Sequence, residues 1–360
     1  MISPVAHIAS MSPYALAQLN APEVKRLISL SQNESPRPPS PLAIEAGAQA
    51  LKAGHLYPDP DWGELRLALS GLHGIPAEGI LCGNGSMELI ACLVQAFADE
   101  QNAVLAPQHA YPFFRTAAQL VQARFDVAPE CDGRVSVDAL LAAVRPDTRI
   151  VFVANPGNPT GTRISRADLV RLREGLSGDT LLVIDEAYGE FADHLGEPMF
   201  DLVEHGDTVV LRTFSKAYGL AGMRVGWGLF PAEIAGEIRK VMNPNNISLA
   251  GQAAAKAALL DQGYMRATCQ KTVRLRDGLR QRLMQAGLDV PESFTNFILI
   301  RFASPEKAHR ADEALRAEGV FLRPQGGAGL ADCLRATIGV AVDIDIAAGI
   351  LERRAEGEKT

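Results

Sequence analysis

Five short stretches of this 360-residue chain are almost continuously apolar, and segments with a helical spacing of apolar residues separate them. A strand that is buried on both faces of a parallel sheet has such a composition, whereas a half-exposed strand alternates apolar and polar residues. The pattern therefore predicts an α/β domain with a mainly parallel, doubly wound sheet. The predicted strands are 79–82, 102–107, 149–156, 180–188 and 208–215, and the clearest helices between them are 87–97 and 165–176.

The pattern changes near residue 245, where "MNPNNIS" (242–248) has the Pro and Asn content of a hinge. A smaller α+β domain is predicted beyond it, with a long helical region toward 286, strands at 295–302, 320–324 and 334–339, a helix near 305–318 and a final helix. We therefore predict an N-terminal arm at 1–40 that partly joins the smaller domain, a large domain at 41–248 and the smaller domain at 249–360.

Composition excludes several classes of protein. The net charge is -7 and the basic residues are scattered, which argues against a nucleic-acid partner. No stretch approaches the ~18 apolar residues of a membrane span, and the N-terminus lacks the basic and apolar regions of a signal peptide. The five cysteines include no C-x-x-C pair, so we expect reduced thiols, a cytoplasmic location and no metal ligands.

One lysine stands out in "RTFSKAYGLAGMRVGW" (212–227). Lys216 follows an apolar strand, and no other charge lies within three positions of it. An unpaired ammonium is costly to bury. Lys216 is therefore either a solvated loop residue or a residue that a pocket holds for chemistry.

Further polar residues follow the other predicted strands, where ligands bind in open α/β sheets. Asp185 ends one strand, Asn158 lies in the turn "NPGNPTG" after another, and "GNGS" (83–86) leads from a strand into a helix. Each has a simpler explanation, since Asp185 could cap a helix and Asn158 could only form a turn. The backbone N–H groups of "GNGS" at a helix N-terminus are suited to a phosphate.

Taken together, these motifs are specific. An Asn-Pro-Thr-Gly turn, then Asp-Glu-Ala-Tyr, then Ser-Lys with an arginine eight residues later occur in this order. In these motifs the chain resembles, over nearly its whole length, the fold-type I aminotransferases, the pyridoxal-phosphate enzymes related to aspartate aminotransferase. Within that group, "QNESPRPPSP", "YPDP", "GNGSMELI" and "LRATIG" are similar to the histidinol-phosphate aminotransferases.

The resemblance implies a role for each residue. Lys216 would form the Schiff base with pyridoxal 5'-phosphate and then move a proton. Asp185 would pair with the ring nitrogen, and Tyr188 and Asn158 would hydrogen-bond the phenolic oxygen. The ring would stack on Tyr111, and Tyr57 of a second subunit would reach the phosphate, which implies a homodimer with shared active sites. The remaining phosphate ligands implied are Gly85, Ser86, Met87, Thr213, Ser215 and Arg224.

The resemblance also implies a substrate site. Arg335 matches the family's substrate-anion arginine, Arg323 a second phosphate-binding arginine of the subfamily, and Asn33 an arm residue near the substrate. In the arm, Tyr14 is followed by "ALAQLN", where the subfamily usually has a Pro-Gly pair. A second departure is "GVAV" (339–342), where many relatives carry Gly-Thr and acidic residues.

The expected activity is that of a pyridoxal-phosphate transaminase that exchanges the amino group between histidinol phosphate and 2-oxoglutarate. One alternative is an aromatic amino acid aminotransferase, in which Arg335 binds a carboxylate and Arg323 is idle. Another is a lyase resembling threonine-phosphate decarboxylase. A non-enzymatic regulator would need a DNA-binding module, and residues 1–40 show no helix-turn-helix pattern.

Overall fold

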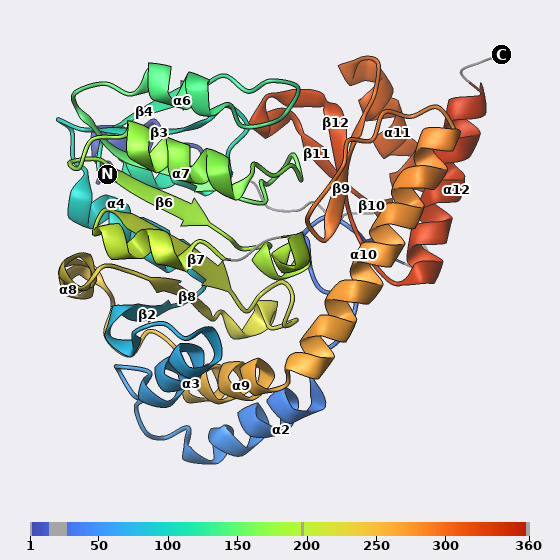
Figure 1. The fold of residues 1–360 in the computed structure, drawn as a ribbon. Helices are drawn as coiled ribbons and strands as arrows, with labels where there is room; N and C mark the ends of the chain where they lie inside the picture. Colours follow the sequence, from blue (N-terminus) through green and yellow to red (C-terminus); the bar gives the residue numbers. More distant parts are fainter. Residues whose placement is uncertain (1, 14–26, 196–197, 358–360) are drawn as a thin grey trace.

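The computed structural model describes residues 2–13, 27–195 and 198–357, so Tyr14 lies outside the described residues. Its centre is a seven-stranded sheet in the order β2-β8-β7-β6-β5-β3-β4 (Figure 1). β8 is antiparallel to both neighbours and the other pairs are parallel, which confirms the predicted mainly parallel sheet. The strands are β2 (Ile80–Gly83), β3 (Ala103–Pro107), β4 (Arg124–Ala128), β5 (Thr148–Ala154), β6 (Leu181–Asp185), β7 (Thr208–Thr213) and β8 (Gly226–Leu229).

Two of these strands, β4 and β8, were missed by the sequence pattern. β4 is an edge strand that leaves Arg124 and Val127 exposed, so it has no continuous apolar run. β8 is only four residues long and contains two glycines, which have low strand propensity. The two strands form because their neighbours in the sheet, β3 for β4 and β2 and β7 for β8, offer backbone N–H and C=O groups for hydrogen bonds.

Helices pack around this sheet, and the two clearest helical predictions are confirmed. α7 begins at a capping box in which the Ser165 and Asp168 side chains each accept the other residue's backbone N–H. Leu89, Ile90 and Leu93 form a buried face of α4. The helices are α1 (Ala6–Ala9), α2 (Pro41–Ala50), α3 (Gly63–His73), α4 (Ser86–Phe97), α5 (Pro112–Leu120), α6 (Val137–Ala143), α7 (Arg166–Gly175), α8 (Ala232–Val241) and α9 (Leu249–Leu260).

A small antiparallel sheet has the order β11-β12-β9 (Figure 1). A second hydrophobic cluster forms around it. The predicted strand 320–324 divides into two strands of different sheets, because β10 pairs in parallel with β1 of the N-terminal arm. The elements are β1 (Ile28–Ser29), β9 (Phe297–Arg301), β10 (Val320–Phe321), β11 (Arg323–Gln325), β12 (Leu330–Thr337), α10 (Gln262–Gln285), α11 (Pro305–Ala317) and α12 (Ala341–Gly357).

The helix α9 packs differently from the prediction. Its buried Ala254, Ala255 and Ala258 belong to the larger hydrophobic cluster, whereas the predicted boundary assigns them to the smaller domain. Small side chains allow this packing, since a Cβ added at Gly47 of α2 would meet the Ala254 Cβ at 3.5 Å. The two clusters therefore divide within α10, and the domain boundaries themselves stay a prediction. Among the described residues, none of the helices has both the length and the apolar character to cross a bilayer.

Candidate active site

The carboxyl ends of β5, β6 and β7 open into a cavity of about 480 Å³. The N-terminus of α4, the arm segment 31–34 and strands β11 and β12 complete its wall. Thirteen predicted site residues line it: Asn33, Ser86, Met87, Tyr111, Asn158, Asp185, Tyr188, Thr213, Ser215, Lys216, Arg224, Arg323 and Arg335. The residues that follow β5, β6 and β7 come together because the carboxyl ends of parallel strands meet at one edge of the sheet, whereas the arm and the small sheet bring Asn33, Arg323 and Arg335 to the cavity.

Lys216 lies inside this cavity, as the pocket alternative required. Its Nζ donates hydrogen bonds to the backbone oxygens of Asn33 at 3.1 Å and Gln32 at 3.3 Å. Burial, and then the positive charge of Arg335, lower the pKa of Lys216 to about 8. About a tenth of the amine is therefore in the neutral, nucleophilic form at pH 7, far more than for a lysine of ordinary pKa.

Asp185 is the last residue of β6 and is 4% exposed. Its Oδ1 accepts the backbone N–H of Ala187 at 3.0 Å. Burial raises the pKa of Asp185 to about 6, and this backbone hydrogen bond only partly offsets the effect. A buried carboxylate in this position is suited to a cationic ring nitrogen, which would favour its charged form.

Ser86 and Met87 at the N-terminus of α4, together with Arg224, form a part of the cavity wall that is suited to an anion and is called the anion seat below. Gly85 precedes the helix at φ 75, and a Cβ there would come 2.3 Å from Nη2 of Arg224. Arg224 donates to Ser215 Oγ at 3.3 Å, and Thr213 Oγ1 donates to the same oxygen at 3.0 Å. Helix N–H groups, a guanidinium and hydroxyls are the groups that bind phosphate.

Gly226 allows the N-terminus of α4, which carries the anion seat, to lie close to strand β8. A Cβ at Gly226 of β8 would lie 2.3 Å from the backbone nitrogen of Ser86. The clash would be with backbone, so the strand or the helix would have to move. The residue Gly85 itself does not appear in the cavity wall, and its contribution is to let Arg224 approach.

Two arginines of the small sheet line the cavity. Arg323 of β11 and Arg335 of β12 are directly opposed in register. Arg335 donates to Asn158 Oδ1 at 2.6 Å and to the backbone oxygen of Ser31 at 2.8 Å. Arg335 thus joins the small sheet to the loop that follows β5 and to the arm.

The two predicted tyrosine contacts have different positions. Tyr111 lines the cavity, and its ring packs edge-on against Phe114 at 5.7 Å between centroids. Tyr57 is 86% exposed and is not among the residues that line the cavity. Its predicted role toward a second subunit stays a prediction. In the described residues, no group of three or more His, Cys, Asp or Glu side chains could hold a metal ion.

Comparison with known proteins decides the family. The model of the family "Aminotransferase class I and II" matches residues 25–351. The chain belongs to this aminotransferase family. The predicted resemblance is therefore confirmed.

Individual relatives of this aminotransferase agree with that result. It is 40% identical over 351 residues to a histidinol-phosphate aminotransferase of Paramagnetospirillum magneticum, covering 96% of each chain. The structure of the histidinol-phosphate aminotransferase of Sinorhizobium meliloti in complex with pyridoxal-5'-phosphate superposes with a TM-score of 0.91, at 29% identity and 98% coverage of both chains. A Thermus thermophilus aspartate aminotransferase double mutant shares the fold, with a TM-score of 0.83 at 22% identity, 98% of this chain and 100% of that chain being covered. The predicted aspartate-aminotransferase-like fold is confirmed.

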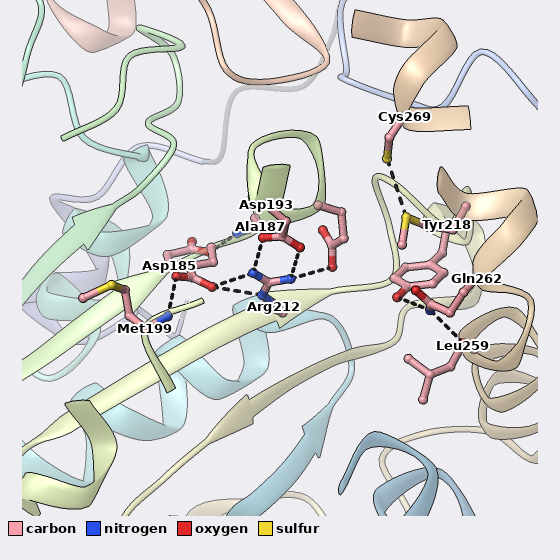
Figure 2. Close-up of polar contacts among 12 residues, drawn as sticks. Asp185, Ala187, Asp193, Met199, Arg212, Tyr218, Leu259, Gln262 and Cys269 are labelled. Atoms are coloured by element: carbon pink, nitrogen blue, oxygen red, sulfur yellow. Dashed lines mark hydrogen bonds and ion pairs between the residues drawn. The ribbon is translucent and has the colours of Figure 1, made fainter. Parts of the chain in front are cut away.

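The aminotransferase also contains a buried ionic cluster that the sequence analysis missed (Figure 2). Arg212 of β7 is 1% exposed, and its Nε and Nη2 donate to Glu186 Oε2 at 2.9 and 2.8 Å. Glu190 and Asp193 also lie within ion-pair distance of its guanidinium. The available signal was an arginine inside the apolar run "VVLRTF" and carboxylates spaced along "DEAYGEFAD".

Proposed function

We propose that this aminotransferase is a pyridoxal-phosphate enzyme that transfers the amino group of histidinol phosphate to 2-oxoglutarate. The observation that carries the proposal is that Lys216 shares one cavity with two separate cationic groups, Arg224 at the helix seat and the Arg323–Arg335 pair. One cationic group suits the phosphate of the cofactor and the other suits the phosphate of the substrate. Relatives named for this reaction support the assignment.

The residues present fit the cofactor. Its phosphate would be held at the seat formed by Ser86, Met87 and Arg224, and its ring nitrogen by Asp185. When bound, the ring withdraws electrons from the bond that breaks next to the substrate nitrogen. Asp185 would keep the ring nitrogen protonated, because an ionised carboxylate and a nitrogen cation stabilise each other and so offset the effect of burial on the carboxylate.

Lys216 supplies the reacting amine. It would hold the cofactor through a covalent bond to its amine and, once the substrate amine takes its place, would accept a proton from the substrate carbon. Its lowered pKa makes the amine neutral, and so able to accept that proton, far more often than the amine of an ordinary lysine would be at the same pH. Lys216→Ala should abolish transamination, and Asp185→Ala should reduce the rate severely; full activity in either variant would contradict its assigned role.

The substrate is tested by single half-reactions of the cofactor-loaded enzyme without a keto acid. Histidinol phosphate, phenylalanine and threonine phosphate are each added, and the visible absorbance and the products are followed. Conversion by histidinol phosphate supports the proposal. Conversion by phenylalanine instead makes this an aromatic aminotransferase, and release of carbon dioxide from threonine phosphate makes it a decarboxylase.

A variant of Arg323 gives a more specific test of whether the substrate phosphate is bound in the cavity. Arg323→Gln removes one charged partner of the substrate phosphate, which costs about 1.5–3 kcal/mol, or about 10–150-fold in kcat/KM. Unphosphorylated histidinol is the matched control, because its kcat/KM should change little. An equal loss with both substrates would contradict phosphate binding by Arg323.

The proposed enzyme is a homodimer whose Tyr57 reaches the phosphate seat of the partner. Exposed leucines on or beside the mutually packed helices α2, α3 and α9, and Leu56 next to Tyr57 in the chain, support an interface: Leu42, Leu51, Leu56, Leu67 and Leu260. Light scattering of the purified protein tests the dimer, and a Tyr57→Phe variant tests the contact through cofactor affinity. A cytoplasmic location belongs to the same proposal, since all five cysteines are free thiols.

A further inference from the structure

Asn33 is the most densely connected residue of the arm segment. It is 1% exposed, and its backbone has φ 56, a left-handed conformation that asparagine tolerates better than most residues. Its backbone oxygen accepts hydrogen bonds from Lys216 Nζ and from Asn296 Nδ2, both at 3.1 Å. Such a residue is held in one orientation by elements from both hydrophobic clusters.

Thr337 decides which way the Asn33 amide points. The Thr337 hydroxyl accepts the backbone N–H of Asn33 at 2.9 Å and donates its own proton to Asn33 Oδ1 at 3.1 Å. The amide oxygen therefore faces Thr337, and the amide NH₂ faces Tyr188. Asn33 Nδ2 donates to the Tyr188 hydroxyl oxygen at 2.8 Å.

This contact has a consequence for Tyr188. A hydroxyl that accepts a hydrogen bond becomes a stronger donor of its own proton, because neighbouring hydrogen bonds polarise each other. Tyr188 is 4% exposed and lines the cavity beside Lys216, whose Nζ lies 5.9 Å from the centre of the tyrosine ring. Because the Asn33 amide donates to the Tyr188 hydroxyl oxygen, the hydroxyl proton of Tyr188 must point away from Asn33.

We propose that Asn33 is a positioning residue that orients and strengthens the Tyr188 hydroxyl as a hydrogen-bond donor to the phenolic oxygen of the cofactor. The inference rests on the proposed function, in which Tyr188 contacts that oxygen. It differs from the expected substrate contact of Asn33, because both ends of the Asn33 amide are engaged with Thr337 and Tyr188. Asn33 acts through Tyr188.

The proposal predicts a spectroscopic change. A weaker Tyr188 donor stabilises the phenolic anion less, so the nitrogen joining Lys216 to the cofactor keeps its proton to a higher pH. Asn33→Gly tests this, because glycine accepts φ 56 and removes the amide without adding a charge. The charged groups that act on Lys216, namely Arg335, Glu34, Arg224 and Asp185, stay in place.

The experiment is a pH titration, from pH 5 to 10, of the visible absorbance of the full-length, cofactor-loaded enzyme without substrate. Asn33→Gly should raise the spectroscopic pKa by about 0.5–1 unit, a three- to tenfold shift of the proton equilibrium. Thr337→Val, which removes the hydroxyl that orients the amide, should raise it too. Asn245→Gly is the matched control, because Asn245 also has a positive φ, 58, but does not line the cavity.

A double-mutant cycle separates positioning from general structural damage. In a Tyr188→Phe background, Asn33→Gly should cause no further shift. An equal shift in that background, or an unchanged spectroscopic pKa in loaded Asn33→Gly, would overturn the inference. If Asn33→Gly fails to load, the same comparison is made with Thr337→Val. A wild-type protein that develops no visible band with pyridoxal phosphate would instead refute the proposed function.

Discussion

Replacing Arg212 by methionine should be among the most destabilising single changes in this protein. Its guanidinium is bonded to Glu186 and Asp193, and Glu190 lies 3.5 Å away. The Glu186 and Glu190 side chains are only 6% and 4% exposed, so removing the cation leaves two buried carboxylates without their countercharge. Breaking a buried pair in this way costs ~3–5 kcal/mol of unfolding free energy.

The loss should depend on pH in a defined direction. Burial raises the pKa of Glu190 to about 7, from an ordinary value of 4.5, and it also raises the pKa of Glu186. The folded state therefore binds protons more readily than the unfolded state. Proton binding to these two carboxyl groups thus stabilises the fold at low pH, and this stabilisation is lost as the pH rises through the folded-state pKa. Without Arg212 both pKa values rise further, so the variant's deficit should be larger at pH 8.5 than at pH 5.5.

The assay is urea unfolding of the full-length, cofactor-free chain in a Trp62→Phe background. Trp227 is then the single tryptophan, and it pairs with Arg212 across β7 and β8. Arg124→Met is the matched control, because Arg124 also bonds two carboxylates but is 42% exposed. Exposed pairs contribute ~0–1 kcal/mol, so the control should lose little.

A second change tests the physical reason for the loss. Glu186→Gln in the Arg212→Met protein removes one uncompensated charge and should recover part of the stability. The reasoning is refuted if Arg212→Met loses no more free energy than Arg124→Met, or if its deficit grows as the pH falls.

Two further predictions concern the cofactor site. The pKa of Lys216 is lowered to about 8. The rate of covalent attachment of pyridoxal phosphate to the cofactor-free enzyme should therefore rise about tenfold per pH unit up to pH 7.5 and level off above pH 9. Stopped-flow absorbance measures this rate, and a rate that still rises at pH 10.5 would indicate a lysine of ordinary pKa. Gly226→Ala should weaken cofactor binding by more than about tenfold, as one lost charge-assisted hydrogen bond would. Its Cβ would press on the backbone nitrogen of Ser86, which belongs to the proposed phosphate site. Gly236→Ala, which has open space around it, should leave the dissociation constant measured by fluorescence titration unchanged.

Much of the site followed from local sequence patterns. Continuous apolar runs predicted the buried strands β5, β6 and β7, and the residues just after them became the walls of the cavity. This worked because parallel strands place their carboxyl ends at one edge of the sheet. Asp185 and Lys216 could therefore be assigned to one site although 31 positions separate them in the chain.

What the pattern could not show was the pairing between distant segments. The placement of α9 against α2, the opposition of Arg323 and Arg335, and the orientation of Asn33 toward Tyr188 were decided by the tertiary structure. Apolar periodicity reports whether a local segment is buried, but not which segment buries it. The sequence by itself thus determined the chemical groups and the edge of the sheet that carries them. Only packing between segments 155 or more residues apart decided that Asn33 donates to Tyr188 and pairs with Thr337.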